Sequence, residues 1–269
     1  MNLRRSLAPA LLGLLSLPLL VSTGCDEKKP EETKPAMTSS AALAVKPPSG
    51  PLPDAKSGEV AASPPKKERV CPPAPAVDFV DKNLETEVRR KLEKPDGPIT
   101  IPDLAKVRTL NLASGKTNEL DRCVFPHFTA VKEIFLGPGE LVDLSPLAGL
   151  KNLESLRASI NRVSDVKPLQ NLTKLDRLDL GRTSVKDLTP LGNLTNLTEL
   201  ALDDTPILEI GALSPLVKLE RLSLKNTMVK DVSALKDMKK LKFLYLTGSA
   251  VDDTGALGPL TAKGLKIQK

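Results

Sequence analysis

Few side chains in this sequence could do chemistry. The chain of 269 residues contains one His, three Cys and no Trp, and only six of its residues are Phe or Tyr. Metal sites built from thiolates and imidazoles need clustered ligands, and a nucleophile with a His base needs that base beside it. Because His127 is the only imidazole and the three Cys are scattered, the sequence predicts no enzyme, no metal site and no cofactor site. We interpret His127 as a packed or surface residue.

The first of the three Cys ends a segment that is typical of an export signal. A basic start at Met1 to Arg5 precedes an apolar stretch from Leu7 to Val21, and small residues then lead to Cys25. The apolar stretch of about 15 residues is shorter than the ~20 that a membrane-spanning helix needs. Removal of this segment would lower the net charge of +6 to about +4. We therefore predict no nucleic-acid partner.

Residues Ser22 to Cys25 resemble the lipobox of bacterial lipoproteins, except that Ser22 stands where that family prefers Leu. The resemblance implies that residues 1–24 are a lipoprotein signal peptide, cleaved before Cys25, and that the Cys25 thiol carries a lipid such as palmitate. A plain signal peptide with an incidental Cys is the alternative.

The next segment, residues 25–76, is predicted to be a lipid-anchored tether without a core of its own. Positions 26–76 contain eleven Pro and no aromatic residue. Such a composition buries too little apolar surface to offset the entropy lost on ordering, which indicates a disordered Pro-rich linker. A Pro-rich ligand for a partner domain is the alternative interpretation.

The rest of the chain is a sequence repeat with a period of 22. Within one unit, seven positions from Leu172 to Leu191 are apolar, and the next unit repeats them from Leu194 to Leu213. A Leu-x-Leu pair in each unit fits a short strand, and stacked units would share one aliphatic core. The first apolar anchors of successive units stand at Phe128, Leu150, Leu172, Leu194, Leu216, Met238 and Leu260.

The segment from Leu180 to Leu191 closely resembles the internalin-like class of leucine-rich repeats, which has this same period. The resemblance implies an α/β fold, a leucine-rich repeat solenoid with a curved parallel sheet on its concave face and short 3-10 or turn segments on its convex face. We expect about seven repeats plus a terminal strand at Leu265 to Ile267 over residues 104–269. A helix with Asp81 as its N-cap, within residues 77–103, would form an N-terminal cap.

Two further positions in each unit are polar. The twelfth position holds small hydrogen-bonding residues that could satisfy backbone groups of the turn after the strand, at Gly139, Asn161, Thr183, Thr205, Thr227 and Ser249. The sixteenth position is acidic and is interpreted as the N-cap of a short helical turn, at Asp143, Asp165, Asp187, Glu209, Asp231 and Asp253. A Ca²⁺-binding ladder is the alternative, but one carboxylate per unit falls short of a site with six to eight oxygens.

If Cys25 carries lipid, the two other Cys remain as a pair. Disulfides persist in exported proteins, so we predict that Cys71 bonds to Cys123 and ties the end of the tether to the folded region. Two unpaired thiols are the alternative.

The predicted strand register places opposite charges side by side on the concave face. The sixth position of the units reads Glu133, Ser155, Arg177, Glu199, Arg221 and Phe243, and the eighth reads Phe135, Arg157, Asp179, Ala201, Ser223 and Tyr245. Asp203 beside Lys225, and Arg182 beside Asp204, extend this alternation. The pattern argues against a groove for a polyanion, which needs charge of one sign. A self-neutralised surface without a ligand is the alternative.

The exposed aromatic pair Phe243 and Tyr245 interrupts this pattern. Aromatic anchors with a polar rim are typical of protein interfaces, so we predict a partner site centred on this pair and Arg221. Phe135, Arg157 and Arg177 complete the predicted binding surface. Stacking of the pair on the exposed end of the solenoid is the alternative.

Together these features predict a monomeric, lipid-anchored protein of the cell envelope that binds a protein partner through its concave face. Its only membrane contact would be the lipid on Cys25, and it would lie on the periplasmic face or cell surface of a Gram-negative bacterium. The alternative is a structural envelope protein that contacts peptidoglycan or polysaccharide. Sugar binding would need a row of stacked aromatic residues, and the sequence offers one pair.

Overall fold

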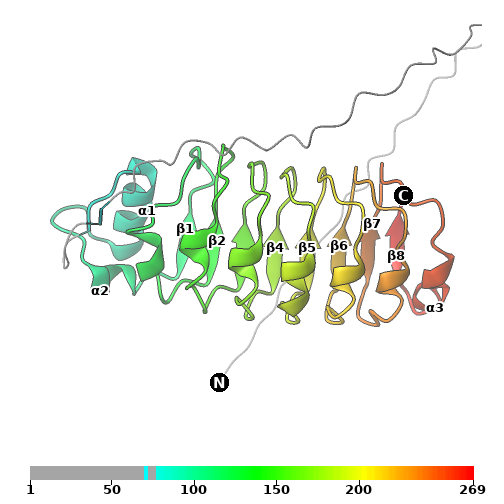
Figure 1. Ribbon diagram of the computed structural model, residues 1–269. Helices are drawn as coiled ribbons and strands as arrows, with labels where there is room; N and C mark the ends of the chain where they lie inside the picture. The colour runs from blue at the N-terminus through cyan, green and yellow to red at the C-terminus, as the bar shows by residue number, and fades with distance from the viewer. Residues whose placement is uncertain (1–69, 72–76) are drawn as a thin grey trace, which may run out of the picture. The chain divides into compact units, whose positions relative to one another are not determined.

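The computed structural model describes residues 70–71 and 77–269 (Figure 1). The predicted signal peptide, Cys25 and the rest of the predicted tether lie outside the described residues, and their roles stay predictions. Within the described residues, no helix is both long and apolar enough to cross a membrane.

Eight short parallel strands form one sheet, and each lies beside the strand that follows it in the chain (Figure 1). The central residue of each strand is apolar and pairs with the next central residue, as Leu156 does with Leu178 and Leu178 with Leu200. Alternate residues point to opposite faces, so these Leu side chains enter the core and their neighbours face outward. The strands are β1 (Thr109–Asn111), β2 (Glu133–Phe135), β3 (Ser155–Arg157), β4 (Arg177–Asp179), β5 (Glu199–Ala201), β6 (Arg221–Ser223), β7 (Phe243–Tyr245) and β8 (Lys266–Gln268).

Short 3-10 helices lie in the connections from each strand to the next and form the opposite layer, whereas α1 and α2 precede β1. The α-helices are α1 (Lys82–Leu92), α2 (Ile101–Leu104) and α3 (Gly258–Thr261). The 3-10 helices are η1 (Phe125–His127), η2 (Ser145–Leu147), η3 (Lys167–Leu169), η4 (Thr189–Asn193), η5 (Gly211–Leu213), η6 (Ser233–Leu235) and η7 (Gly255–Leu257). The predicted solenoid, with a parallel sheet on one side and 3-10 turns on the other, is therefore confirmed.

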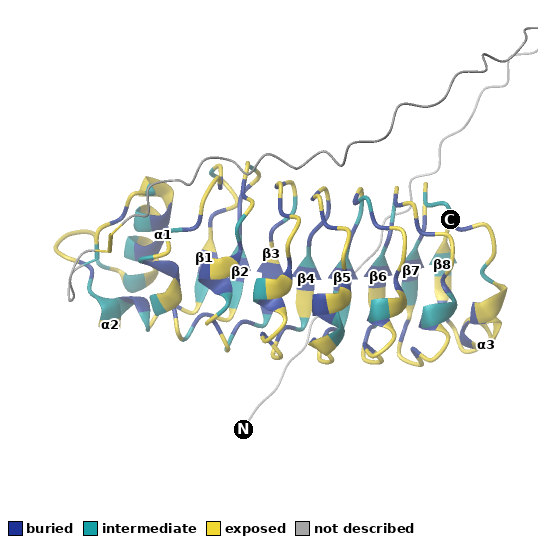
Figure 2. Cartoon of the chain, in the orientation of Figure 1, coloured by how far each residue is buried: buried dark blue, intermediate teal, exposed yellow. Residues whose placement is uncertain are grey.

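The core is a continuous stack of mainly Leu, Ile and Val side chains between the two layers. In Figure 2 the buried positions recur along the successive repeats. In the repeat that begins at Leu172, the apolar positions Leu175, Leu178, Leu180 and Val185 are at most 2% exposed. Among the described residues, aromatic rings enter the core only towards its N-terminal end, at Phe79, Phe125 and Phe128. The rings of Phe125 and Phe128 pack edge to face with centroids 5.7 Å apart. Stacked aliphatic side chains thus fill the core elsewhere.

Helix α1 packs beside the first strand of the sheet. Asp81 begins it by accepting the backbone N–H of Asn83 at 2.8 Å, and Leu84 and Val88 are buried. The buried carboxylate of Glu87 accepts the backbone N–H of Asn111 in β1 at 2.9 Å. This bond satisfies a donor at the edge of the sheet that no strand covers. The predicted helix is present, and its function as a cap stays a prediction.

The two Cys that the sequence analysis paired are joined by a disulfide. The Cα atoms of Cys71 and Cys123 lie 5.3 Å apart, across 52 positions of sequence. Residue 71 is thereby held against the loop that precedes η1.

The twelfth position has the predicted hydrogen-bonding role in four of the six units; Gly139 has no side-chain donor, and the buried hydroxyl oxygen of Ser249 has no hydrogen-bond partner among the described residues. Thr183, Thr205 and Thr227 are buried, and each hydroxyl donates to the carbonyl three residues earlier at 2.5 to 2.8 Å. The buried amide of Asn161 donates to three carbonyls and accepts the backbone N–H of Leu141 at 3.2 Å. These side chains replace water in turns that the stacking of repeats buries.

The acidic sixteenth position differs from its predicted N-cap role. In five units the Asp carboxylate at this position accepts the backbone N–H of the residue two positions later, at 2.6 to 2.8 Å; these are Asp143, Asp165, Asp187, Asp231 and Asp253. The N-cap residue of the 3-10 helix is the intervening one, such as Leu188, so the Asp forms an Asx turn one residue earlier. Hydrogen bonds from the side chain and backbone of Thr189 lower the pKa of Asp187.

The last strand is displaced by one residue from its predicted position. Phe243 pairs with Lys266, where a strict period of 22 would place Leu265. Strand β8 therefore covers Lys266–Gln268, and Leu265 is buried before it. The turn before β8 contains the α-helical turn α3 in addition to η7, and this longer connection accounts for the extra residue.

Candidate partner-binding groove

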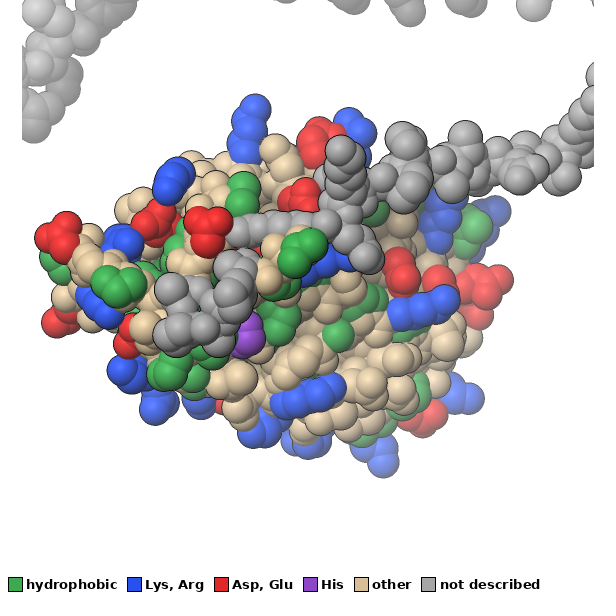
Figure 3. Space-filling model, turned by 60° about the vertical axis from the view of Figure 1, so that its left-hand side comes forward, with side chains coloured by type: hydrophobic (Ala, Val, Ile, Leu, Met, Phe, Trp, Pro, Cys, Tyr) green, Lys and Arg blue, Asp and Glu red, His purple; other side chains and the backbone are tan. Residues whose placement is uncertain are grey.

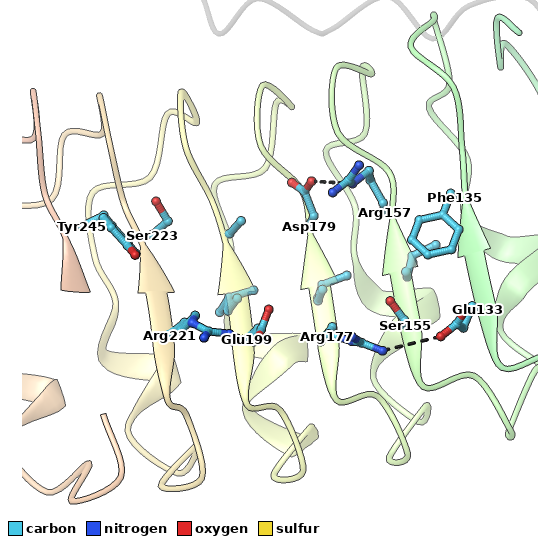
Figure 4. A pocket seen from close by; sticks show the side chains of 14 residues that line it. Glu133, Phe135, Ser155, Arg157, Arg177, Asp179, Glu199, Arg221, Ser223 and Tyr245 are labelled. Carbon is cyan, nitrogen blue, oxygen red and sulfur yellow. Dashed lines mark hydrogen bonds and ion pairs between the residues drawn. The ribbon is translucent and has the colours of Figure 1, made fainter. Parts of the chain in front are cut away.

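An open groove of about 400 Å³ lies on the outward face of the sheet and extends from β2 to β7 (Figure 4). Leu156, Leu178 and Leu200 line it together with the outward side chains of the strands. Small side chains at Ser155, Ala201 and Ser223 alternate with longer ones. The outward side chains that line the groove are Glu133, Phe135, Ser155, Arg157, Arg177, Asp179, Glu199, Ala201, Arg221, Ser223 and Tyr245.

Five of the six side chains predicted to contact a partner line this groove: Phe135, Arg157, Arg177, Arg221 and Tyr245. Phe243 is the exception, although its strand neighbour Tyr245 is included. The register that the sequence analysis predicted for β2 to β7 is present, with Glu133 beside Ser155 and Arg177 beside Glu199. The structure thus brings the predicted residues onto one face. That they bind a partner stays a prediction.

Ion pairs between strands neutralise most of the groove. Arg157 Nε lies 3.2 Å from Asp179 Oδ2, and Arg177 Nη2 reaches across β3 to Glu133 Oε1 at 3.5 Å (Figure 4). The predicted Arg182–Asp204 pair is also present, at 3.5 Å. Basic and acidic side chains are also interspersed at the end of the molecule that carries α1 and α2, which Figure 3 brings forward. The predicted alternation of charge is therefore present on the sheet.

Arg221 pairs with Glu199 in the same way. The predicted neighbour of Lys225 is correct, but the contact differs. Asp203 accepts the backbone N–H of Lys225 at 2.9 Å and the hydroxyl of Ser223. The Lys225 ammonium instead lies 4.9 Å from the centroid of the Tyr245 ring.

The two aromatic rings of β7 lie nearly parallel, at 11°, with their centroids 6.5 Å apart. Both residues are half-buried rather than exposed as predicted, because strands flank β7 on both sides. Arg221 of β6 and Lys266 of β8 lie over the Phe243 ring, 5.6 and 5.8 Å from its centroid. The pair does not form the bare end of the solenoid, since β8 follows it.

In residues 70–71 and 77–269, no three His, Cys, Asp or Glu side chains are placed to hold a metal ion. His127 lies in η1, at a repeat junction on the layer opposite the sheet.

Comparisons with known proteins agree with this geometry. The family model for Leucine Rich repeats (2 copies) matches residues 151–193. The folded region is a leucine-rich repeat solenoid. A search of curated protein sequences finds no match.

Solved structures with the same fold include two internalins from Listeria monocytogenes. The first, inlF, is 28% identical with a TM-score of 0.64 over 68% of this chain, which spans 54% of that structure. The second, internalin C2, is 22% identical with a TM-score of 0.59. The match covers 71% of this chain and 93% of the internalin C2 structure. A leucine-rich repeat protein from Leptospira interrogans is 20% identical with a TM-score of 0.51. The match covers 63% of this chain and 50% of the Leptospira protein.

Sequence reasoning missed two side chains of this leucine-rich repeat solenoid that surround the aromatic pair. The sequence analysis placed Lys225 beside Asp203 and did not assign Lys266 to the outward face. Lys225 stands at the tenth repeat position. From there its long side chain reaches the ring of Tyr245, which stands at the eighth position of the next unit. Lys266 could not be placed from a strict count of 22, because the last connection has one extra residue.

Proposed function

We propose that this leucine-rich repeat protein binds a protein partner through the outward face of its sheet. The groove of about 400 Å³ across β2 to β7 is the observation that carries the proposal. It combines charges of both signs with aromatic rings near its two ends, at Phe135 and Tyr245. A protein surface can match such a mixed pattern, whereas a polyanion would meet the carboxylates of Glu133, Asp179 and Glu199.

The contacts of the aromatic pair support a protein over a neutral polysaccharide. A sugar that stacks on an aromatic ring needs one face of that ring to be free. Cations from both neighbouring strands lie over Phe243, and Lys225 lies over Tyr245. A structural protein that contacts peptidoglycan is therefore the second candidate.

Photo-crosslinking tests this proposal. We would replace Ala201, which lines the middle of the groove, with p-benzoylphenylalanine in the full-length protein expressed in its own cells. Lys236, which is exposed at the end of η6 on the opposite layer, is the matched control position. We expect a discrete protein adduct from position 201 that is absent from position 236. Equal adducts from both positions, or sedimentation with purified peptidoglycan without any protein adduct, would refute a protein-binding sheet face.

We also propose that a lipid on Cys25 anchors the protein at the cell envelope and that the protein acts as a monomer. The lipobox-like residues Ser22 to Cys25 and the apolar stretch before them support this anchor. Metabolic labelling with alkynyl palmitate should mark the full-length protein and should not mark a Cys25→Ser variant. Equal labelling of the wild type and the variant would mean that the lipid is attached at another residue. Labelling of neither protein would refute the lipid anchor.

A further inference from the structure

The positive charge of this protein is concentrated in its last two repeats. Residues 216–269 contain eleven Lys and Arg but five Asp and Glu, an excess that equals the net charge of +6 of the whole chain. Three of these cations face the aromatic pair of β7: Arg221, Lys225 and Lys266. We call these three cations, with Phe243 and Tyr245, the basic aromatic patch.

The cations of this patch differ from those in the rest of the groove. Arg157 and Arg177 each lie within 3.5 Å of a carboxylate oxygen on the sheet face. In the part of the chain that the structure describes, neither Lys225 nor Lys266 forms an ion pair with a carboxylate. Both ammonium groups are held over rings instead, at 4.9 and 5.8 Å from the centroids.

A cation over an aromatic ring is attracted to the electron-rich face but keeps its other hydrogen-bond donors for a further group. Lys266 is exposed and Lys225 is half-buried, so both can meet an incoming anion. Arg221 forms an ion pair with Glu199, and its guanidinium has five N–H donors. The patch therefore offers ordered, incompletely neutralised donors beside apolar ring surface.

We propose that the basic aromatic patch binds an acidic segment of the protein partner. This inference rests on the proposed function and adds the chemistry of the partner at one end of the groove. Charge complementarity supports an acidic group at the patch, while the ion-paired groove from β2 to β5 suits a partner surface of mixed charge. A uniform polyanion would meet Glu133, Asp179 and Glu199 as soon as it left the patch.

The spacing of the cations suggests the form of a suitable probe. Arg221 and Lys266 lie on strands two apart, a separation of about 10 Å. Carboxylates three residues apart on a polyproline II segment lie about 9 Å apart on one side of it. A peptide of Glu-Pro-Pro units therefore presents acids at a matching distance, and a Gln-Pro-Pro peptide is its neutral control.

Tyr245 itself provides a signal for the test, because it is the only Tyr in a chain without Trp. Tyrosine emission of the full-length protein therefore reports on the patch alone when peptides without aromatic residues are added. We expect the Glu-Pro-Pro peptide to change this emission saturably and the Gln-Pro-Pro peptide to leave it unchanged. Equal responses to the two peptides, or no response to either, would overturn the proposal.

Paired variants then locate the binding. Lys225→Gln with Lys266→Gln should weaken binding of the acidic peptide by about fivefold for each ion pair lost. Lys236→Gln with Lys239→Gln removes the same charge outside the patch and should leave the affinity unchanged. Equal weakening in both double variants would mean that overall charge, and not the patch, attracts the peptide.

Two further probes distinguish other anionic ligands. Polygalacturonate and vesicles containing phosphatidylglycerol should bind less tightly than the peptide at equal concentration of acidic groups. Tighter binding of either would overturn the assignment to a protein segment. The crosslinking experiment at position 201 tests the proposed function separately. A protein adduct at position 201 without a change in Tyr245 emission on adding the acidic peptide would refute the acidic segment and leave the protein-binding sheet face standing.

Discussion

The hydroxyl of Thr227 allows a direct test of how the buried turns between repeats are stabilised. It donates to the carbonyl oxygen of Leu224 at 2.8 Å, and both residues are at most 3% exposed. Within the described residues, no backbone N–H donates to that carbonyl. Replacement by Val keeps the shape of the side chain and removes only the donor. The carbonyl of Leu224 would then be left buried and unpaired.

The cost of an unpaired buried acceptor is about 1–3 kcal/mol, and the lack of a second donor favours a value of about 2 kcal/mol. For a folded region of this size, that loss corresponds to a decrease in the melting temperature of about 4–8 °C. We would measure unfolding of wild type and Thr227→Val by far-ultraviolet circular dichroism in urea and on heating.

Ser249 is the matched control at the same repeat position. Its backbone N–H donates to Leu246 at 2.8 Å, and its buried hydroxyl oxygen has no hydrogen-bond partner among the described residues. Ser249→Ala should therefore change the free energy of unfolding by less than about 0.5 kcal/mol. If Thr227→Val were as mild as Ser249→Ala, the hydroxyl bond could not be what stabilises the turn.

Three other changes have expected outcomes that unfolding in urea or acid can measure. Ile160 is β-branched, half-exposed and held at φ 58°, a backbone conformation that Asn adopts more easily. Ile160→Asn should therefore raise the free energy of unfolding by about 1 kcal/mol, and a decrease would refute backbone strain at this position. Glu87→Leu should destabilise by about 2 kcal/mol because the N–H of Asn111 loses its acceptor, whereas Glu87→Gln, which keeps one, should cost less. Hydrogen bonds from Thr100, and then from Lys106 and Lys94, hold the pKa of Asp103 well below its ordinary value of 3.8. A lowered pKa stabilises the fold above the ordinary value, and this contribution is lost as the pH falls below it towards the folded pKa. Asp103→Asn should therefore make stability depend less on pH below about 4, and an unchanged acid profile would contradict this.

The sequence was sufficient to predict the fold because the repeat constrains many residues at once. Each of Leu172, Leu178 and Leu180 has an equivalent one period later, and one strand register satisfies the units from β2 to β7. That register also placed Arg177 beside Glu199 on the outward face. Periodicity thus determined which residues are neighbours wherever the connections have equal length.

Periodicity did not determine where long side chains end. A register places the Cα atoms of Asp203 and Lys225 on neighbouring strands, but the Lys225 stem can reach several groups. Tertiary packing directs its ammonium to Tyr245, and the backbone N–H of Lys225 bonds to Asp203 instead. The exposure of Phe243 was misjudged for a similar reason, because cations from two other strands lie over its ring.

The sequence by itself determined the stacked aliphatic core, the parallel sheet and the alternation of charge across β2 to β6, because these follow from a period of 22. Only the tertiary structure decided the position of β8, since an extra residue before it breaks the period and brings Lys266, rather than Leu265, beside Phe243. The basic aromatic patch exists because of that shift: a buried Leu and an exposed Lys exchange sides when a strand moves by one residue.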